Sequence, residues 1–443
     1  MAVLTRKVFV SLLSGIVLGQ LILYGGDFFT SVPTVDLLLA QFSETWKIKT
    51  IFFVIMVGAI IQLITSSGGI EAFIAYVSKK RINSKRSTLF MGYIIGVLIF
   101  LESSITALVV GALTKPLAQK YKISKAKLAY LCDCTSSPVC SLFPFNGWGA
   151  LLLGLIATQI DYGIIQGEAL SLLVYAIPLN FYAITTMVFL FVIILTGKDF
   201  GPMKKAELLA AQEESTCLMK SFQSEGSIKA MFYPIIVMLL SVPVSLFITG
   251  QGDMLAGSGS SAIFYSVLVT LIFIAVYYSV KKIMSLEIYF VELKKGAGDM
   301  VGIGFILLLA FSLGDVTVKL NTGPYLASLV DGNISAVYIA AIVFLVSSLM
   351  AFSTGTSWGT FSIMMPIALP MAAVLDANIP LVIAAVISGG VFGDHCSPIS
   401  DTTIISAMAA DCETIEHVRT QLPYALSSGF ITLILFVLFG HLL

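Results

Sequence analysis

Charged residues are scarce in this chain. Asp, Glu, Lys and Arg together make up 11% of the 443 residues, whereas an ordinary soluble domain has roughly a quarter. Hydrophobic residues make up 58%, and long apolar runs recur along the whole chain. An ordinary soluble domain is therefore excluded. The runs are continuously apolar and do not alternate, which excludes a β-barrel and predicts a polytopic all-α membrane protein.

The chain also lacks the spacings that mark common metal sites and hydrolases. Its six cysteines include the pair Cys132 and Cys134, but no second pair stands at zinc spacing, so we expect small apolar side chains. The HExxH motif is absent. Intramembrane aspartyl proteases need Gly-x-Gly-Asp, and Val391 occupies the first glycine position before Asp394. We therefore expect neither an enzyme nor a resident cofactor.

The few basic residues are clustered, and their placement predicts a topology. Twenty-two of the 25 Lys and Arg fall in clusters, the exceptions being Lys47, Lys49 and Lys319. Because positive residues stay on the cytoplasmic side, we placed every cluster inside. One path satisfies them all: nine spans and two re-entrant hairpins, at 87–114 and about 335–372. The alternative is an ordinary crossing at each hairpin, which would put a lysine-rich loop outside.

This path fixes the predicted surroundings of the chain. The N-terminus lies inside and the C-terminus outside the cytoplasmic (inner) membrane, with the lipid bilayer as the main partner. The net charge of zero indicates no partner by itself, and we expect no nucleic acid. The oligomeric state stays open, with a homodimer as one option.

Short motifs recur in the same order in the two halves of the chain. Ser103–Pro116 reads SSITALVVGALTKP and Ser353–Pro366 reads STGTSWGTFSIMMP. Each begins S-[ST]-x-T, with a proline ten residues after the threonine. Asp133 then opens DCTSSP, and Asp394 opens DHCSP. The charge placement gives these segments opposite orientations, which predicts inverted repeats at 1–197 and 261–443, joined by a cytoplasmic loop at 198–230 and a linker span at 231–260.

The Ser-Pro pairs predict two discontinuous helices near the membrane midplane. Proline removes a backbone hydrogen bond and clashes with the preceding turn, so Pro138 and Pro398 are expected to break their helices. The freed carbonyls, hydroxyls and carboxylates are hard oxygen ligands that suit a small cation, and ionisable groups at that depth are functional by default. Sodium is expected at Asp394, Asp401 and Asp133. The full set of predicted ion- or substrate-binding residues is Glu102, Ser103, Ser104, Thr106, Asp133, Ser136, Ser137, Ser353, Thr354, Thr356, Asp394, His395, Ser397, Ser400, Asp401 and Thr402.

Structural alternatives exist for most of these residues. The carboxylates could cap broken helix ends, His395 could be a hydrogen-bonded structural histidine, and the Ser and Thr hydroxyls could bond back to their own helices. His417 and Arg419 follow the last broken span, where a salt bridge with Glu413 or Glu416 is expected. A buried carboxylate that holds either a proton or a sodium ion would be sufficient for exchange.

Two stretches of the second half resemble a known family. FGDHCSPISDTT at 392–403 and DCETIEHVRTQLPYAL at 411–426 are similar to the signature of the NhaC family of sodium/proton antiporters, as AFSTGTSWGT at 351–360 is to its hairpin segment. The resemblance implies secondary active transport, with sodium and protons as partners. We expect sodium/proton antiport by alternating access. The alternative is a sodium- or proton-coupled carrier or exchanger of a small organic acid or amino acid.

Overall fold

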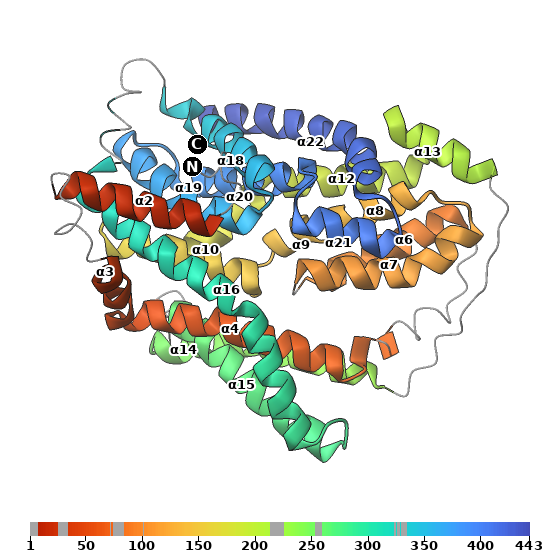
Figure 1. Cartoon of the computed structure of the whole chain (residues 1–443), viewed down its shortest axis with the longest axis horizontal. Coiled ribbons are helices and arrows are strands. Elements are labelled where there is room, and N and C mark those ends of the chain that lie inside the picture. Colours follow the sequence, from red (N-terminus) through yellow and green to blue (C-terminus); the bar gives the residue numbers. More distant parts are fainter. Residues whose placement is uncertain are drawn as a thin grey trace.

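The computed structural model describes residues 8–24, 34–70, 72–73, 84–100, 102–212, 226–252, 259–322, 325, 328 and 335–443. All regular structure in these residues is helical, and most helices run along the long axis of the molecule (Figure 1). The helices are α2 (Val8–Leu23), α3 (Thr34–Ala40), α4 (Thr45–Ser66), α6 (Lys85–Leu98), α7 (Ser103–Lys120), α8 (Lys125–Cys134), α9 (Ser137–Ser141), α10 (Gly147–Asp161), α11 (Ala169–Ala176), α12 (Phe181–Thr196), α13 (Gly201–Gln212), α14 (Ile228–Thr249), α15 (Gly259–Val280), α16 (Leu286–Lys319), α18 (Ile339–Thr354), α19 (Ser357–Val374), α20 (Ile379–Cys396), α21 (Asp401–Ala410) and α22 (Thr414–Leu442). Three short 3-10 helices complete the described elements: η1 (Gln41–Ser43), η2 (Ile177–Leu179) and η4 (Ala336–Tyr338).

The apolar runs form helices of membrane-spanning length. Eight helices in the described residues are long and apolar enough to cross a bilayer. Three shorter apolar helices, at Phe9–Leu23, Gly147–Asp161 and Phe264–Val280, accompany them. The predicted all-α polytopic class is therefore confirmed, whereas the count of nine spans stays a prediction.

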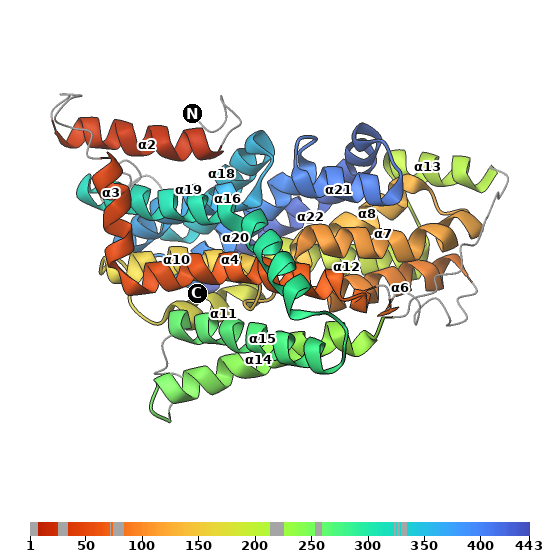
Figure 2. The ribbon, with the colours of Figure 1, turned by 60° about the horizontal axis from the view of Figure 1, so that its bottom comes forward.

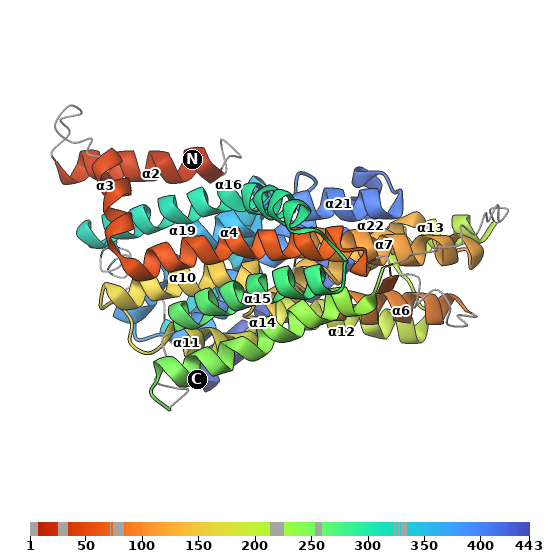
Figure 3. The same ribbon diagram turned by 90° about the horizontal axis from the view of Figure 1, so that it is seen from below.

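Long helices from both halves of the chain form a layer along one side of the molecule. Helices α4 and α16 pack against each other, α15 packs against α4 and α14, and α2 lies along α16 (Figures 2 and 3). The backbones of α4 and α16 touch where Gly58 crosses Gly296, since a Cβ on either residue would strike the other residue's carbonyl oxygen. Small residues allow this close approach of membrane helices.

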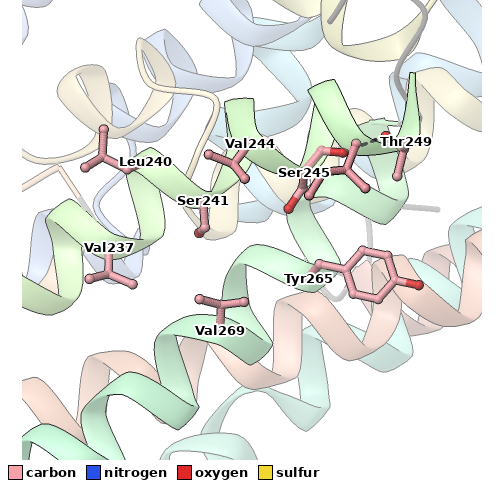
Figure 4. A pocket seen from close by; sticks show the side chains of 9 residues that line it. Val237, Leu240, Ser241, Val244, Ser245, Thr249, Tyr265 and Val269 are labelled. Carbon is pink, nitrogen blue, oxygen red and sulfur yellow. Dashed lines mark hydrogen bonds between the residues drawn. The ribbon is translucent and has the colours of Figure 1, made fainter. Parts of the chain in front are cut away.

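A groove on this layer lies between α14 and α15 (Figure 4). Its volume is about 560 Å³, and most of its lining is aliphatic. The hydroxyls of Ser241 and Thr249, which face it, already donate to carbonyl oxygens of α14. The groove therefore offers few oxygen ligands to an ion.

The predicted hairpins appear as two helix pairs at opposite ends of the molecule. Helices α6 and α7 pack together at the end where α8 begins, and α18 and α19 pack together at the other end (Figure 1). The order of elements also repeats, because each pair is followed by an interrupted helix and then by a long apolar segment. Superposition of the halves and re-entry of the hairpins from opposite membrane faces stay predictions.

Both Ser-Pro pairs interrupt their helices, as the sequence predicts. Helix α8 ends at Cys134 and α9 begins at Ser137, with Pro138 in the first turn of α9. Proline is tolerated there because the amide it lacks would have no partner within the helix. Helix α20 ends at Cys396, and Ser397 adopts an extended conformation (φ −87°, ψ 127°). The residue before a proline is driven out of the helical region by steric clash.

The predicted loop at 198–230 contains a helix that the sequence analysis did not anticipate. Helix α13 spans Gly201–Gln212, and its Met203 and Glu207 are buried. The Glu207 carboxylate accepts a hydrogen bond from the Ser124 backbone amide at 2.7 Å and pairs with Lys85. These contacts hold α13 against the ends of α6 and α8.

Candidate ion-binding site

Asp394 lies in a cage of hydroxyl groups at the break between α20 and α21. Its side chain is buried, with 1% of its surface exposed. Ser400 Oγ donates to Asp394 Oδ1 at 2.5 Å, while Ser357 Oγ and Thr402 Oγ1 donate to Oδ2 at 2.9 and 3.1 Å. Every polar group on this carboxylate is therefore an oxygen. Oxygen-only sites suit hard cations such as sodium.

The cage is built by the helix break itself. Ser400 caps α21, because its Oγ accepts the Thr403 backbone amide at 3.4 Å. The Thr403 hydroxyl donates to the carbonyl oxygen of Asp394 at 3.2 Å. One short segment thus terminates α20, starts α21 and supplies two of the three hydroxyls. Helix α20 also ends at this point, and the partial negative charge of a helix C-terminus favours a cation.

The tip of the α18–α19 hairpin closes the other side of the cage. Gly355 has a left-handed backbone (φ 68°), and a Cβ there would lie 2.7 Å from the Ile399 carbonyl oxygen. Ser397 Oγ donates to the Phe352 carbonyl oxygen at 2.8 Å. The hairpin tip and the helix break therefore fit together as one unit, which places Ser357 against Asp394.

Asp133 lies in a different environment, although it is the counterpart of Asp394 in the repeat. Gln421 Nε2 donates to Asp133 Oδ2 at 2.6 Å, and His417 Nε2 lies 3.3 Å from the same oxygen. Ser406 Oγ lies 3.4 Å from Oδ1, and His395 Nε2 lies 3.9 Å from it. Gln421 directs an amide N–H at Asp133, which repels a cation, and the two histidines bring ring nitrogens where Asp394 has hydroxyl oxygens. The structure therefore does not support Asp133 as a sodium ligand.

The first hairpin contributes its carboxylate as a helix cap. Glu102 accepts the Ile105 backbone amide at 2.8 Å and so caps α7. Ser103 Oγ lies 3.3 Å from the same carboxylate, and the Thr106 hydroxyl bonds to backbone carbonyls at the tip. Ser104 is half-buried beside them. These residues gather at one tip, but none of them shares a hydrogen bond with Asp394 in the structure.

Four further predicted ligands, three at the tip of the second hairpin and one at the start of α21, form hydrogen bonds with backbone atoms. The Ser353 and Thr354 hydroxyls donate to carbonyl oxygens one turn earlier in α18, and Thr356 caps α19. Asp401 opens α21 with an exposed side chain that accepts the Thr402 amide at 2.9 Å. Capping and back-bonding, the alternatives considered above, describe these four residues.

The remaining predicted residues pack around the two breaks. Ser136 Oγ donates to the Asp133 carbonyl oxygen at 2.8 Å, and the Ser137 hydroxyl is buried with no hydrogen-bond partner among the described residues. His395 Nδ1 lies 3.2 Å from the Tyr182 hydroxyl oxygen, so its ring contacts α12 and Asp133, not Asp394.

The expected salt bridge of His417 with Glu413 or Glu416 is wrong. His417 is buried, and its Nε2 contacts Asp133. The imidazole lies on the face of α22 that packs on α8, whereas Glu413 and Glu416 are both exposed. The same face carries Gln421 one turn later.

Sequence reasoning also missed Ser357, Gln421 and Asn146. Ser357 is one residue beyond the predicted S-T-x-T set, at the first turn of α19, where hydroxyls gather. Gln421 stands four residues after His417, the spacing that puts two side chains on one helix face. Asn146 Nδ2 donates to the Phe100 and Cys140 carbonyl oxygens at 2.8 Å, which ties the first hairpin to the first break.

The comparisons with known proteins agree with the predicted class. Residues 139–441 match the Na+/H+ antiporter family. An uncharacterized protein of Haemophilus influenzae is 32% identical over 99% of this chain and 88% of its own length. The malate-2H+/Na+-lactate antiporter of Bacillus subtilis is 35% identical over 22% of this chain and 21% of its own length.

The fold also resembles that of a solved transporter. The YdaH transporter of Alcanivorax borkumensis superposes with a TM-score of 0.65 at 14% identity, covering 90% of this chain and 86% of YdaH. Among the described residues, no group of three or more His, Cys, Asp or Glu is arranged to hold a metal ion. The match over 139–441 includes the Asp394 cage and α22, and the chain therefore belongs to the Na+/H+ antiporter family, which confirms the predicted secondary active sodium/proton antiport.

Proposed function

We propose that sodium binds in the Asp394 cage and that this site is the sodium site of the exchange. The observation that carries the proposal is a buried carboxylate with hydroxyl oxygens from Ser357, Ser400 and Thr402 around it. An unpaired carboxylate inside a membrane protein is costly. A sodium ion neutralises this charge, and the three hydroxyls can turn their lone pairs toward the ion.

The position of the cage fits alternating access. It lies where a hairpin tip meets a helix break, so a small movement of either element changes which side of the site is open. Inverted repeats place such sites at their interface near the membrane midplane. Exchange then requires that proton binding oppose sodium binding, and the simplest arrangement has both ions competing for Asp394.

The proposed setting is the cytoplasmic membrane, with the N-terminus inside and the C-terminus outside. The start of α6, the end of α7 and the start of α8 carry Lys85, Lys120 and Lys125, and all three helix ends lie near α13 at one end of the molecule (Figure 1). Positive residues gathered at one end support a cytoplasmic assignment of that end.

The test is sodium-driven proton flux in proteoliposomes. We expect an imposed sodium gradient to drive proton movement, read with a pH dye, in wild type. Asp394→Asn keeps the shape of the side chain but removes its charge, and its flux should fall to the level of empty liposomes. Asp411→Asn is the matched control, because Asp411 lies in an exposed turn and should support wild-type flux. Wild-type flux in Asp394→Asn at equal protein incorporation would refute the proposal.

A second candidate is sodium-coupled exchange of a small organic acid. The buried Trp148 Nε1 has no hydrogen-bond partner among the described residues, and its ring contacts Trp358, which follows Ser357. This unsatisfied N–H beside the cage is free to donate a hydrogen bond to a carboxylate oxygen of a solute. The Bacillus subtilis relative is named for malate and lactate. Uptake of labelled malate and lactate by the same liposomes distinguishes the candidates, since an ion-only exchanger takes up neither.

A further inference from the structure

A second buried ionisable group lies beside the cage, and the exchange at Asp394 does not use it. Asp133 and His417 face each other with both side chains completely buried, His417 Nε2 lying 3.3 Å from Asp133 Oδ2. The other ring nitrogen of His417, Nδ1, has no hydrogen-bond partner among the described residues, nor does Oε1 of Gln421. Unpaired buried polar atoms are costly, so these two neighbouring atoms without partners call for an explanation.

Of the two orphaned atoms, Nδ1 of His417 is the one that is able to take up a proton. When His417 Nε2 donates to Asp133, its Nδ1 presents a free lone pair to the protein interior. A proton that binds there converts the imidazole to an imidazolium, and the neighbouring carboxylate stabilises that charge. The Asp133–His417 pair thus carries one negative charge without the proton and none with it.

A direct chain of contacts joins this pair to the sodium cage. Gln421 Nε2 donates to Asp133 Oδ2 at 2.6 Å and to the His395 carbonyl oxygen at 2.9 Å. His395 follows Asp394 in α20, immediately before the break. Gln421 therefore connects a change of charge at Asp133–His417 to the backbone that positions Asp394.

We propose that the Asp133–His417 pair is the proton-binding site of the exchange and that it excludes sodium from Asp394 when it is protonated. This inference rests on the proposed sodium site at Asp394 and changes where the proton binds. One proton enters the pair as one sodium ion leaves the cage, so the two neighbouring sites together hold a single added positive charge. The competition takes place between two sites and not at one carboxylate.

Other ionisable groups lie on the same and on neighbouring elements, and each is an alternative binding position for the proton. On α8, α22 and the elements packed near them these groups are Tyr93 of α6, Glu102 at the start of α7, Lys127, Tyr130, Cys132 and Cys134 of α8, Cys140 of α9, Tyr182 of α12, Glu207 of α13, Asp394, His395 and Cys396 of α20, Asp401 of α21, and Glu416 and Tyr424 of α22. Lys127 is paired with Asp199, and Glu207 with Lys85. His395 already contacts the Tyr182 hydroxyl through Nδ1. His395 Nε2 also has no hydrogen-bond partner among the described residues, but it lies 3.9 Å from Asp133, whereas His417 Nε2 lies at 3.3 Å and leaves its second ring nitrogen unpartnered.

Sodium binding to the purified protein across about pH 5 to pH 8 tests the proposal. In wild type, we expect sodium affinity to fall as the pH is lowered. The fall should be about tenfold per pH unit in the range where one proton is exchanged for one sodium ion. His417→Gln keeps a donor for Asp133 but cannot take up a proton. We expect this variant to retain wild-type affinity at the alkaline end and to lose most of the pH dependence.

Two further variants control the measurement. Asp133→Asn removes the other partner and should flatten the pH dependence in the same way. His441→Gln changes an exposed histidine at the end of α22, whose Nδ1 bonds to the Val437 carbonyl oxygen, and should behave like wild type. Sodium binding is compared only between proteins that elute as monodisperse samples, so that an unfolded variant is left out of the comparison.

The outcomes separate this inference from the proposed function. Absence of sodium binding in wild type would overturn the sodium site at Asp394 itself. Sodium binding whose pH dependence persists unchanged in both His417→Gln and Asp133→Asn would overturn the proton site and return the proton to Asp394. Loss of sodium binding at every pH in both variants would also overturn it, because the pair would then belong to the sodium site.

Discussion

Asp133 and Asp394 are the same residue type, but the side chains around them differ in chemistry. Hydroxyl oxygens surround Asp394, while imidazole and amide nitrogens reach Asp133. A hydroxyl can turn either its proton or its lone pairs toward a partner, so it serves a bare carboxylate and a bound cation equally. An amide N–H can only donate. The two counterparts are therefore not interchangeable.

Two serines of one hairpin provide a sharp test at this scale. We predict that Ser357→Ala weakens sodium binding by about tenfold, or about 1.4 kcal/mol, because it removes one of few oxygens on Asp394. Ser353→Ala removes a hydroxyl that bonds to Leu349 within α18, and its sodium affinity should stay at the wild-type value. Calorimetric titration of both variants with sodium measures the difference. Equal losses in the two variants, or a larger loss in Ser353→Ala, would count against the assigned ligands.

At the scale of elements, the α18–α19 tip and the α20–α21 break act as one joint. The joint requires glycine at position 355 for two reasons. Its backbone is left-handed, and a Cβ there would strike the Ile399 carbonyl oxygen. Gly163 shares the left-handed backbone (φ 69°), but nothing lies within 4 Å of a Cβ placed there. The two glycines therefore separate backbone strain from the clash.

We predict that Gly355→Ala is more damaging than Gly163→Ala. Both substitutions incur about 1–2 kcal/mol of backbone strain, and the clash at Gly355 adds about 1–3 kcal/mol. Gly355→Ala should therefore show the larger fall in melting temperature and lose transport, whereas Gly163→Ala should transport normally. Thermal unfolding in detergent and liposome flux measure both effects. Similar melting temperatures for the two variants would mean that the joint is looser than the structure shows.

The turn between α21 and α22 gives a prediction about pH. Asp411 accepts a hydrogen bond from Lys125 at 3.0 Å and lies 3.8 Å from Lys115. The hydrogen bond from Lys125, with the charge of Lys115, lowers the pKa of Asp411. A carboxylate with a lowered pKa contributes stability above its unfolded pKa of about 3.9 and loses that contribution as pH falls through the folded pKa.

We therefore expect Asp411→Asn to leave stability and transport near neutral pH almost unchanged. The side chain is 58% exposed, and exposed ion pairs contribute about 0–1 kcal/mol. The variant should lose less stability than wild type on acidification below about pH 4. Melting temperatures measured from acidic to neutral pH check this. A shift of the transport pH profile in Asp411→Asn would show that the turn takes part in proton coupling.

On the scale of the whole molecule, much of the architecture could be predicted from the sequence. Hydrophobic runs indicated a polytopic helical protein, and proline located both helix breaks at Pro138 and Pro398, whereas the re-entry of the two hairpins stays a prediction. These are local signals, since they depend on backbone chemistry within a few residues. The family signature lies on the same segments.

The partners of the buried carboxylates could not be predicted in this way. Ser357 reaches Asp394 from another helix, 37 residues away in the sequence, and Gln421 reaches Asp133 across 288 residues. Such contacts depend on how whole helices pack, and sequence patterns within one helix do not determine that packing. The same reason explains His417, whose nearest carboxylates in the sequence, Glu413 and Glu416, are not its partners.

The central claim, that Asp394 holds the sodium ion, is tested most directly by sodium titration of purified protein at alkaline pH. Wild type should show saturable heat of binding, and so should the Asp411→Asn control. Asp394→Asn should show none, while its elution profile and melting temperature confirm that it is folded. Saturable sodium binding of wild-type affinity in folded Asp394→Asn would contradict the account, because the ion would then be held by other oxygens.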